Sequence, residues 1–249
     1  MLTQRHQVTR THSSDYPDPP VIPAPPWDRR RERAIELAVF LFLIVPSMLL
    51  SFFAAQEGQL PFALLAASTM ARDLSLVALI VFFMGRNREP VAAIGWQARR
   101  LGREVMLGVA LFPLLFFAST TVNIALRAAG FSGPSSPQPD LVPAPDPGQL
   151  VLAVVLVVVV AVSEETIFRG YLMRRIEELS ASPAWAIVLS AAIFSLGHGY
   201  EGSAGVITVG LSGVVLGVVY WWRRSIVAPV VMHFLLDLAA IVAIPVLLR

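Results

Sequence analysis

The sequence has no cysteine and few charged residues, and both absences narrow the class of protein. Without cysteine there is no disulfide framework and no thiolate chemistry. Charged residues make up 14% of the chain, against about 25% in an ordinary soluble domain, while hydrophobic residues make up 56%. The formal net charge of +2 gives no indication of a nucleic-acid partner. This composition indicates a protein of the lipid bilayer.

Long apolar stretches follow a proline-rich start. Residues 1–33, with six prolines, are expected to form a disordered cytoplasmic tail. A bilayer core about 30 Å thick needs about 20 helical residues. Stretches close to that length cover residues 34–55, 60–84, 104–127, 149–173, 184–200, 204–222 and 226–247. We therefore predict an all-α, polytopic helical membrane protein with about seven transmembrane spans.

The loop 129–148 contains six prolines and divides these spans into two groups. Three N-terminal transmembrane helices lie within residues 34–128, and a C-terminal four-helix unit lies within residues 149–247. No internal repeat is evident. In the sixth span, Gly213 and Gly217 form a pair of small residues four apart, which is typical of close helix packing.

Arginines are concentrated in alternate loops between the predicted spans. They occur within residues 28–33, 85–103, 174–175 and 223–224, whereas the other loops carry mostly acidic or uncharged residues. Loops rich in positive charge normally stay on the cytoplasmic side. We expect the N-terminus in the cytoplasm and the C-terminus outside. A bacterial plasma membrane fits a chain with this tail and these arginine anchors.

Ionisable groups within the spans gather in the four-helix unit. Such groups are costly in lipid and usually mark a functional site. They are Glu164, Glu165 and Arg169 in the fourth span, His198 in the fifth, and His233 and Asp237 in the seventh. A single ion pair could be a structural brace, and a single histidine an interhelical hydrogen bond. Six such groups in three spans favour a polar site.

Helical spacing predicts which of these groups meet. Glu165 and Arg169 are four residues apart and can pair on one helix face. Glu164 is turned by about 100° from Glu165, so we expect it to face a different neighbour. His233 and Asp237 are also four apart and can touch.

Two further charges, Arg72 and Asp73, lie near the middle of the second span. Because they are adjacent, they should point about 100° apart and should not face each other. We expect each to reach a partner on another helix in a structural role.

Three short motifs carry a resemblance to a known family. They are EETIFR at residues 164–169, FSLGH at 194–198 and HFLLD at 233–237. Their order and their placement in successive spans resemble the CPBP family of intramembrane glutamic endopeptidases, also called the Abi or CAAX-protease-like family. That family includes type II CAAX prenyl endopeptidases and proteins linked to bacteriocin processing or self-immunity. The resemblance covers about residues 149–245.

The resemblance implies a hydrolytic site. Glu164 and His198 would hold and activate the attacking water, and His233 and Asp237 would stabilise the oxyanion. A carboxylate in a low-dielectric cavity is a stronger base, and an oxyanion donor can contribute about 10²–10³ in rate.

Supporting roles follow from the same resemblance. Glu165 and Arg169 would pair and fix the helix around the site, and Phe194 would belong to the structural support of the site. One departure concerns Asp237, since most relatives have asparagine there. An ionised aspartate cannot donate to an oxyanion. It could stay protonated, or it could accept from His233 and leave the other ring nitrogen as donor, which we favour.

A metal mechanism is the alternative for the same residues. Glu164, His198, His233 and Asp237 are all of metal-ligand type, and three ligands plus water make a catalytic zinc site. The sequence has no His-Glu-x-x-His motif. We expect no cofactor, with zinc as the less favoured possibility.

Depth along the helices raises a difficulty for His198. Glu164 lies about 15 Å from Arg174, whereas His198 lies about 22 Å from Pro183, at 1.5 Å per residue. A tilted fifth span, or one beginning later than Pro183, would bring them to the same depth.

The sequence thus favours a membrane-embedded glutamic-type endopeptidase that cleaves a peptide or protein substrate at or in the membrane. A non-catalytic immunity or regulatory protein that binds a peptide is one alternative. A proton-coupled transporter is another, although the absence of an inverted repeat weighs against it.

Overall fold

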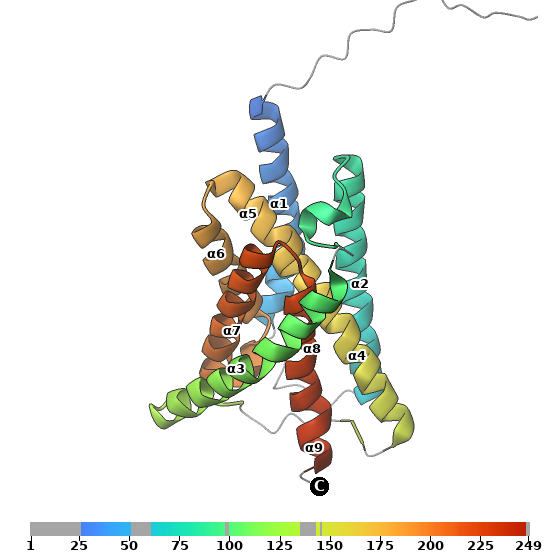
Figure 1. Cartoon of the computed structure of the whole chain (residues 1–249), viewed down its shortest axis with the longest axis vertical. Coiled ribbons are helices and arrows are strands. Elements are labelled where there is room, and N and C mark those ends of the chain that lie inside the picture. Colours follow the sequence, from blue (N-terminus) through green and yellow to red (C-terminus); the bar gives the residue numbers. More distant parts are fainter. Residues whose placement is uncertain (1–25, 51–60, 98–99, 135–142, 145, 248–249) are drawn as a thin grey trace, which may run out of the picture.

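The computed structural model describes residues 26–50, 61–97, 100–134, 143–144 and 146–247. Within these ranges the chain is helical and has no strand, which confirms the all-α prediction (Figure 1). The α-helices are α1 (Pro26–Leu50), α2 (Phe62–Arg86), α3 (Leu101–Ala128), α4 (Pro147–Glu165), α5 (Met173–Ser180), α6 (Pro183–Leu196), α7 (Gly202–Arg223), α8 (Val227–Asp237) and α9 (Ile244–Leu247). Two short 3₁₀-helices are η2 (Val91–Ile94) and η5 (Gly199–Glu201), and two π-helices are η4 (Thr166–Leu172) and η6 (Leu238–Ala243).

The number of spans differs from the prediction of seven. Five helical stretches of the described residues are long and apolar enough to cross a bilayer. They are Phe62–Arg86, Leu101–Ala128, Pro147–Ser180, Gly199–Arg223 and Val227–Leu247. The predicted fifth span is shorter than expected, because α6 has 14 residues and ends at Leu196. The predicted first span, 34–55, extends beyond the described part of α1.

The helix α1 begins earlier than the sequence indicated. Residues 26–33 were assigned to the disordered tail, but the helix starts at Pro26. Proline is well suited to a first helical position, because its missing N–H would have no partner there. Arg30 donates to the Leu179 carbonyl at 2.8 Å and Arg33 pairs with Glu89, so this part of α1 packs on the protein. Residues 1–25 of the expected tail lie outside the described ranges.

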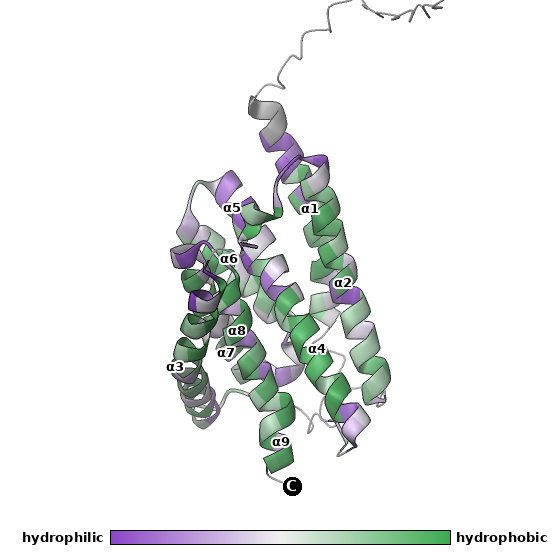
Figure 2. Ribbon diagram, turned by 45° about the vertical axis from the view of Figure 1, so that its right-hand side comes forward, coloured by the Kyte–Doolittle hydropathy of each residue, from purple (hydrophilic) through white to green (hydrophobic). Residues whose placement is uncertain are grey.

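The arginine-bearing segments meet at one end of the bundle (Figures 1 and 2). Arg175 is fully buried there and lies within 3.1 Å of Glu36 of α1, Glu89 after α2 and Glu178 of α5. The Tyr171 hydroxyl donates to Glu36 at 2.6 Å. This ionic cluster ties α1 and the end of α2 to the helix that carries the motif EETIFR. Which side of the membrane this end faces stays a prediction.

Small residues set the closest helix crossings. A Cβ on Gly213 would meet Ala191 at 3.2 Å and one on Gly217 would meet Ile187 at 3.2 Å, so α7 packs tightly on α6. The predicted close packing at these glycines is confirmed. A Cβ on Gly108 would lie 2.7 Å from Val231, which shows that α3 approaches α8 equally closely.

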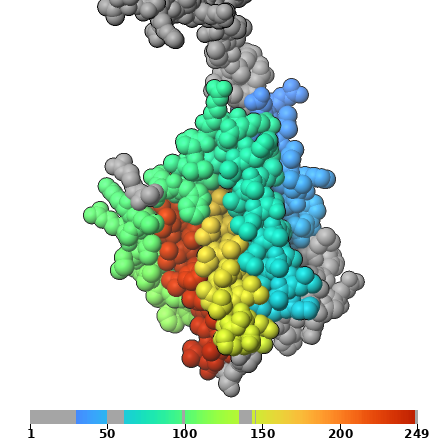
Figure 3. Space-filling view, turned by 90° about the vertical axis from the view of Figure 1, so that its right-hand side faces the viewer, coloured from blue at the N-terminus to red at the C-terminus, as the bar shows by residue number. Residues whose placement is uncertain are grey.

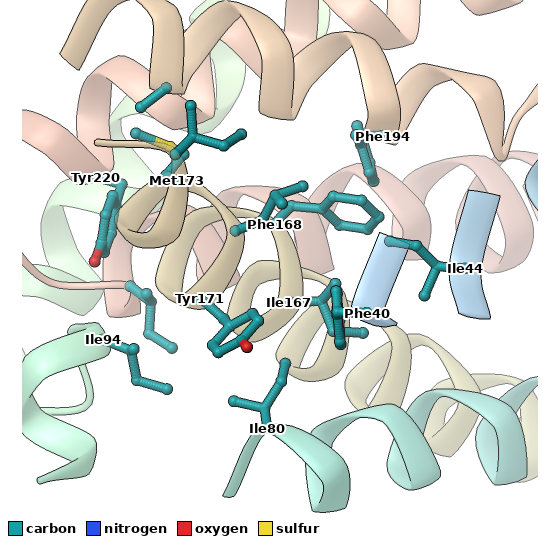
Figure 4. Packing of buried hydrophobic residues seen from close by; sticks show 14 of the residues in the cluster. Phe40, Ile44, Ile80, Ile94, Ile167, Phe168, Tyr171, Met173, Phe194 and Tyr220 are labelled. Atoms are coloured by element: carbon teal, nitrogen blue, oxygen red, sulfur yellow. The ribbon is translucent and has the colours of Figure 1, made fainter. Parts of the chain in front are cut away.

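The helix that carries the acidic residues lies in the middle of the molecule. On one face, α4 lies between α2 and α8 (Figure 3). Its π-helical continuation is buried on all sides, and Ile167, Phe168 and Tyr171 form the centre of the main hydrophobic cluster with residues of α1, α2 and α6 (Figure 4).

Candidate functional site

Each of the two helices that carry acidic motif residues becomes π-helical immediately after them. The α4 helix ends at Glu165 and continues as η4, and α8 ends at Asp237 and continues as η6. Such π-segments are rare and often occur at functional sites, because they change the direction of side chains within one helix. Gly170 in η4 allows close contact, since a Cβ there would lie 2.9 Å from the Ile94 carbonyl oxygen.

His233 joins the acidic residues of the two helices. Its Nδ1 lies 2.8 Å from Oε1 of Glu165, which is 68 residues earlier in the chain. Its Nε2 lies 3.7 Å from Oε2 of Glu164 and 3.4 Å from Oδ2 of Asp237. One imidazole therefore bridges three carboxylates from α4 and α8.

This arrangement corrects two predictions. Glu164 and Glu165 were expected to face different neighbours, yet both reach His233, because the two ring nitrogens lie on opposite sides of the imidazole. Asp237 was expected to orient His233 and leave the other nitrogen as a free donor. That other nitrogen, Nδ1, is engaged by Glu165, so Glu165 is the residue that fixes the orientation of the ring.

Glu165 and Arg169 form the ion pair that their spacing predicts. Arg169 Nη1 lies 2.7 Å from Glu165 Oε1, and the two side chains are 1% and 0% exposed. Arg169 Nη2 also donates to the Gly213 carbonyl at 3.4 Å. A buried pair is strongly destabilised when one partner is removed, so these contacts hold Glu165 against His233.

Phe194 connects the remaining motif residues. Its ring lies 4.9 Å from the ring of His198 and 5.9 Å from that of His233, in both cases edge-on. The Arg169 guanidinium lies 4.5 Å from its centroid, and Phe168 packs on it at 5.0 Å (Figure 4). The phenylalanine therefore contacts both histidines.

His198 lies beyond the end of its helix. The helix α6 ends at Leu196, and His198 belongs to the turn before η5, with Nδ1 3.3 Å from the Phe194 carbonyl oxygen. Of the two expected explanations, a tilted fifth span or one that begins after Pro183, the second is excluded, because α6 begins at Pro183 with Ser182 as its cap.

The length of α5 explains the depth of His198. The preceding helix continues to Ser180, well past Arg174. Counted from Ser180, Glu164 lies about 24 Å along the helix, at 1.5 Å per residue. This matches the roughly 22 Å between Pro183 and His198.

Arg72 and Asp73 were expected to reach partners on other helices, but they bind each other. Arg72 Nε and Nη2 lie 3.0 and 2.9 Å from Oδ1 of Asp73. The arginine side chain is long enough to curve back over the helix, which a comparison of Cα directions does not take into account. The helix α2, which carries the pair, packs along α4, which carries Glu164.

The zinc alternative can be compared with the geometry. No group of three or more histidine or acidic side chains in the described ranges is arranged to hold a metal ion.

An apolar groove lies beside the site. It has a volume of about 140 Å³ and runs between α4 and α8. Its lining is formed by Val158, Val162, Val230, Val231 and Phe234. Val162 is three residues before Glu165, and Phe234 follows His233, so the groove opens within one helical turn of the carboxylates.

Two contacts of the site had not been expected. The Trp96 indole donates to Thr166 Oγ1 at 3.2 Å, which anchors the segment after η2 beside Glu165. The Gly213 carbonyl accepts from Arg169. Trp96 and Gly213 are not ionisable, so a search for charges in apolar spans does not find them.

Comparison with known proteins supports the interpretation of the motifs. Residues 146–239 match the family model described as type II CAAX prenyl endopeptidase Rce1-like. No protein of curated function and no solved structure matches the chain. The matched part contains all three motifs and confirms the predicted CPBP family. Residues 146–239 of this integral membrane protein therefore belong to the Rce1-like family of type II CAAX prenyl endopeptidases.

Proposed function

We propose that the chain is a membrane-embedded glutamic endopeptidase in which Glu164 activates a water molecule. The observation that carries this proposal is the meeting of Glu164, Glu165 and Asp237 around His233, which joins two helices far apart in the sequence. The family match supports peptide-bond hydrolysis as the reaction class. The substrate is then a peptide or protein within or at the membrane.

The state of Glu164 supports its role as the base. Its side chain is 14% exposed, and its Oε2 is buried without a hydrogen-bond partner among the described residues. A buried carboxylate oxygen of this kind can accept a hydrogen bond from a water molecule. Oε2 of Glu165 is also without a hydrogen-bond partner among the described residues, but the side chain of Glu165 is 0% exposed and its Oε1 is held by Arg169 and His233. Glu164 is therefore the better placed of the two to meet water.

The proposed reaction has two steps. Glu164 takes a proton from water while the water oxygen forms a bond with the carbonyl carbon of the peptide, and the carbonyl electron pair moves to its oxygen. The oxyanion then reforms the carbonyl, the C–N bond breaks, and Glu164 returns the proton to the leaving nitrogen. The products are one new carboxyl group and one new amine.

The two histidines have supporting parts in this mechanism. His233, oriented by Glu165 through Nδ1, presents Nε2 to the space between Glu164 and Asp237. His198 shares the proton of the water with Glu164, as in the family that the motifs resemble. The apolar groove between α4 and α8 is suited to an apolar side chain of the substrate, because its lining is aliphatic and aromatic.

The proposal is tested with a fluorogenic peptide library and detergent-purified protein. Wild type is compared with Glu164→Ala, each with and without a strong chelator. We expect cleavage by the wild type that survives the chelator and is lost in the variant. Activity that the chelator abolishes and zinc restores would replace this mechanism with the metal-dependent one. Peptide binding without cleavage, equal in both proteins, would favour the non-catalytic alternative.

A further inference from the structure

The pair formed by Arg72 and Asp73 lies near the middle of α2, whereas the other charged residue of this helix, Arg86, lies at its end. Arg72 lies ten residues after Phe62 and fourteen before Arg86, about 15 and 21 Å from the ends of the helix. A charge near the middle of a span is costly and usually serves a function. The two side chains differ sharply in exposure, at 54% for Arg72 and 2% for Asp73.

The geometry of the pair leaves one side of the guanidinium available. Nε and Nη2 of Arg72 both face Oδ1 of Asp73, at 3.0 and 2.9 Å. Nη1 makes no hydrogen bond or ion pair with the described part of the chain. Asp73 therefore fixes the arginine by one edge, while Nη1 remains free to bind a ligand.

The pair adjoins the Glu164 side of the site. The helix α2 packs along α4, which carries Glu164, and on one face of the molecule the two helices lie in contact (Figure 3). Arg72 interacts electrostatically with Glu164 and with Tyr200 of η5, and Asp73 interacts with His233. Oδ2 of Asp73 and Oε2 of Glu164 are both buried without a hydrogen-bond partner among the described residues. The α2 pair thus lies on the helix that packs against the helix of the proposed base, within electrostatic range of it.

The residues around His233 supply few donors for an oxyanion. Asp237 and Glu164 are acceptors when ionised. Nδ1 of His233 is engaged by Glu165, and Arg169 is directed at Glu165, so Nε2 of His233, between Glu164 and Asp237, is the donor of this group that remains for an oxyanion. A tetrahedral oxyanion needs donors or positive charge aimed at it, and several carboxylates around it would repel it. The free edge of Arg72 is a cationic donor that these contacts do not use.

We propose that Arg72 stabilises the oxyanion of the tetrahedral intermediate and that Asp73 is the positioning residue that holds its guanidinium. This inference rests on the proposed peptidase function and adds a residue of α2, outside the matched range 146–239. Arg72 donates from Nη1 to the negative oxygen after water has added. It releases that oxygen when the carbonyl reforms.

The first test compares kcat and KM for Arg72→Gln, Arg72→Lys and wild type on a peptide that the enzyme cleaves. Loss of one oxyanion donor typically lowers kcat by about 10²–10³-fold. We expect this fall in Arg72→Gln with little change in KM, partial recovery in Arg72→Lys, and a smaller fall in Asp73→Asn. Arg86→Gln, which removes an exposed arginine from the end of the same helix, is the matched control and should equal wild type.

The outcomes separate this inference from the proposed function. If Glu164→Ala is inactive while Arg72→Gln retains the wild-type kcat, the role of Arg72 is refuted and the peptidase proposal stands. If Arg72→Gln raises KM only, and only for peptides with a free carboxyl terminus, Arg72 binds the substrate terminus and the oxyanion role is wrong. If Glu164→Ala is as active as wild type, the proposed function itself fails.

A second measurement does not depend on turnover. Affinity is measured for a peptidyl phosphinate, which is a tetrahedral anion, and for the corresponding amide peptide. Arg72→Gln should lower the affinity for the phosphinate at least tenfold and leave the affinity for the amide peptide within threefold of wild type. Equal affinities of wild type and variant for the phosphinate would overturn the inference. Equal melting temperatures of the two proteins establish that the variant is folded.

Discussion

At the scale of single residues, Glu165 connects more of the site than its motif position suggests. It accepts from Arg169 at 2.7 Å and lies 2.8 Å from His233, while being wholly buried. Its carboxylate therefore couples the π-helical segment after α4 to the histidine of α8. Glu165 is a structural anchor, whereas Glu164, which is partly exposed, is the proposed base.

The anchor role predicts a specific pattern of stability. Glu165→Gln leaves the Arg169 guanidinium buried and unpaired, which should lower the free energy of unfolding by about 3–5 kcal/mol. Replacing both residues, as Glu165→Gln with Arg169→Met, removes the unpaired charge and should recover much of that loss. Denaturation of the three proteins in one detergent measures the difference. Additive losses in the double variant would show that the two residues do not act as a pair.

Asp237 allows a second prediction at this scale. Because Glu165 already fixes His233, the carboxylate of Asp237 is not needed to orient the ring. An asparagine has nearly the same shape and can both donate and accept. Asp237→Asn should therefore keep peptidase activity within about tenfold of wild type, whereas Asp237→Leu should lose more, because it removes the polar partner 3.4 Å from Nε2 of His233. If the Asn and Leu variants are equally inactive, the negative charge is essential and this interpretation is wrong.

The ionisable residues of the four-helix unit could be found from the sequence, but the partners that several of their side chains reach could not. The six ionisable residues of the four-helix unit were found from their cost in lipid, and the pair of Glu165 with Arg169 followed from spacing. The shared contact of Glu164 and Glu165 with His233 was missed, because it depends on the two-sided imidazole. The Arg72–Asp73 pair was missed because the long arginine side chain folds back toward its neighbour.

At the scale of elements, close helix crossings fix where the site residues lie. The helix α8, which carries His233 and Asp237, is crossed by α3 at Gly108. Any side chain at this glycine would push α3 away from α8. Gly102, on the same helix, has open space around it and provides a comparison.

These two glycines yield a matched prediction. In Gly108→Ala the new methyl group would lie 2.7 Å from Val231 and 2.8 Å from the Ala228 carbonyl oxygen. Overpacking of this kind should cost about 1–3 kcal/mol of stability. Gly102→Ala should be neutral or stabilising by up to about 1 kcal/mol, since alanine favours a helix. Thermal unfolding in detergent distinguishes them, and equal melting temperatures would contradict the tight crossing.

Helix boundaries were harder to predict than helix existence. The length of the apolar stretches placed helices in all the expected regions that the structure describes. It could not show that α5 continues to Ser180, because the residues after Arg174 are polar and resemble a loop. It could not predict the π-helices either, since hydropathy does not tell i→i+5 backbone hydrogen bonds from i→i+4 ones.

At the scale of the whole molecule, the ionic cluster joins the matched domain to the N-terminal helices. Arg175 is fully buried and contacts acidic residues of α1 and of the segment after α2. The family match begins at residue 146, and both Glu36 and Glu89 precede it. The contacts of Arg175 therefore connect the matched domain to the N-terminal part of the chain. The N-terminal helices are thus held in a fixed position, which the proposed role of Arg72 requires.

Removal of this central cation should destabilise the entire protein. Arg175→Met removes the guanidinium that contacts Glu36, Glu89 and Glu178. The free energy of unfolding should fall by about 3–5 kcal/mol. Arg224→Met removes an exposed arginine that lies 3.5 Å from Glu177 and should cost about 0–1 kcal/mol. Size-exclusion chromatography and thermal unfolding of both variants test this. Similar stabilities would show that the cluster does not hold the two parts of the protein together.

The membrane class, the all-α fold and the family could be predicted from the sequence, because composition and three motifs determine them. Five helical stretches of the described residues, and not seven, are long and apolar enough to cross a bilayer, since α6 has only 14 residues and the first predicted span extends beyond the described part of α1. The part played by α2 could not be predicted, because it depends on which helices pack against α4.

The most direct measurement is the rate of cleavage of one defined peptide by wild type, Glu164→Gln and Glu177→Gln. Glu177→Gln is the control, because Glu177 lies outside the site, in an exposed ion pair of α5. The helix α5 continues the helix that carries Glu164. The account predicts that Glu164→Gln is slower by at least about 10²–10⁴-fold, as for the loss of a general base, while Glu177→Gln equals wild type. Equal rates for the two variants would contradict the claim that Glu164 activates the water.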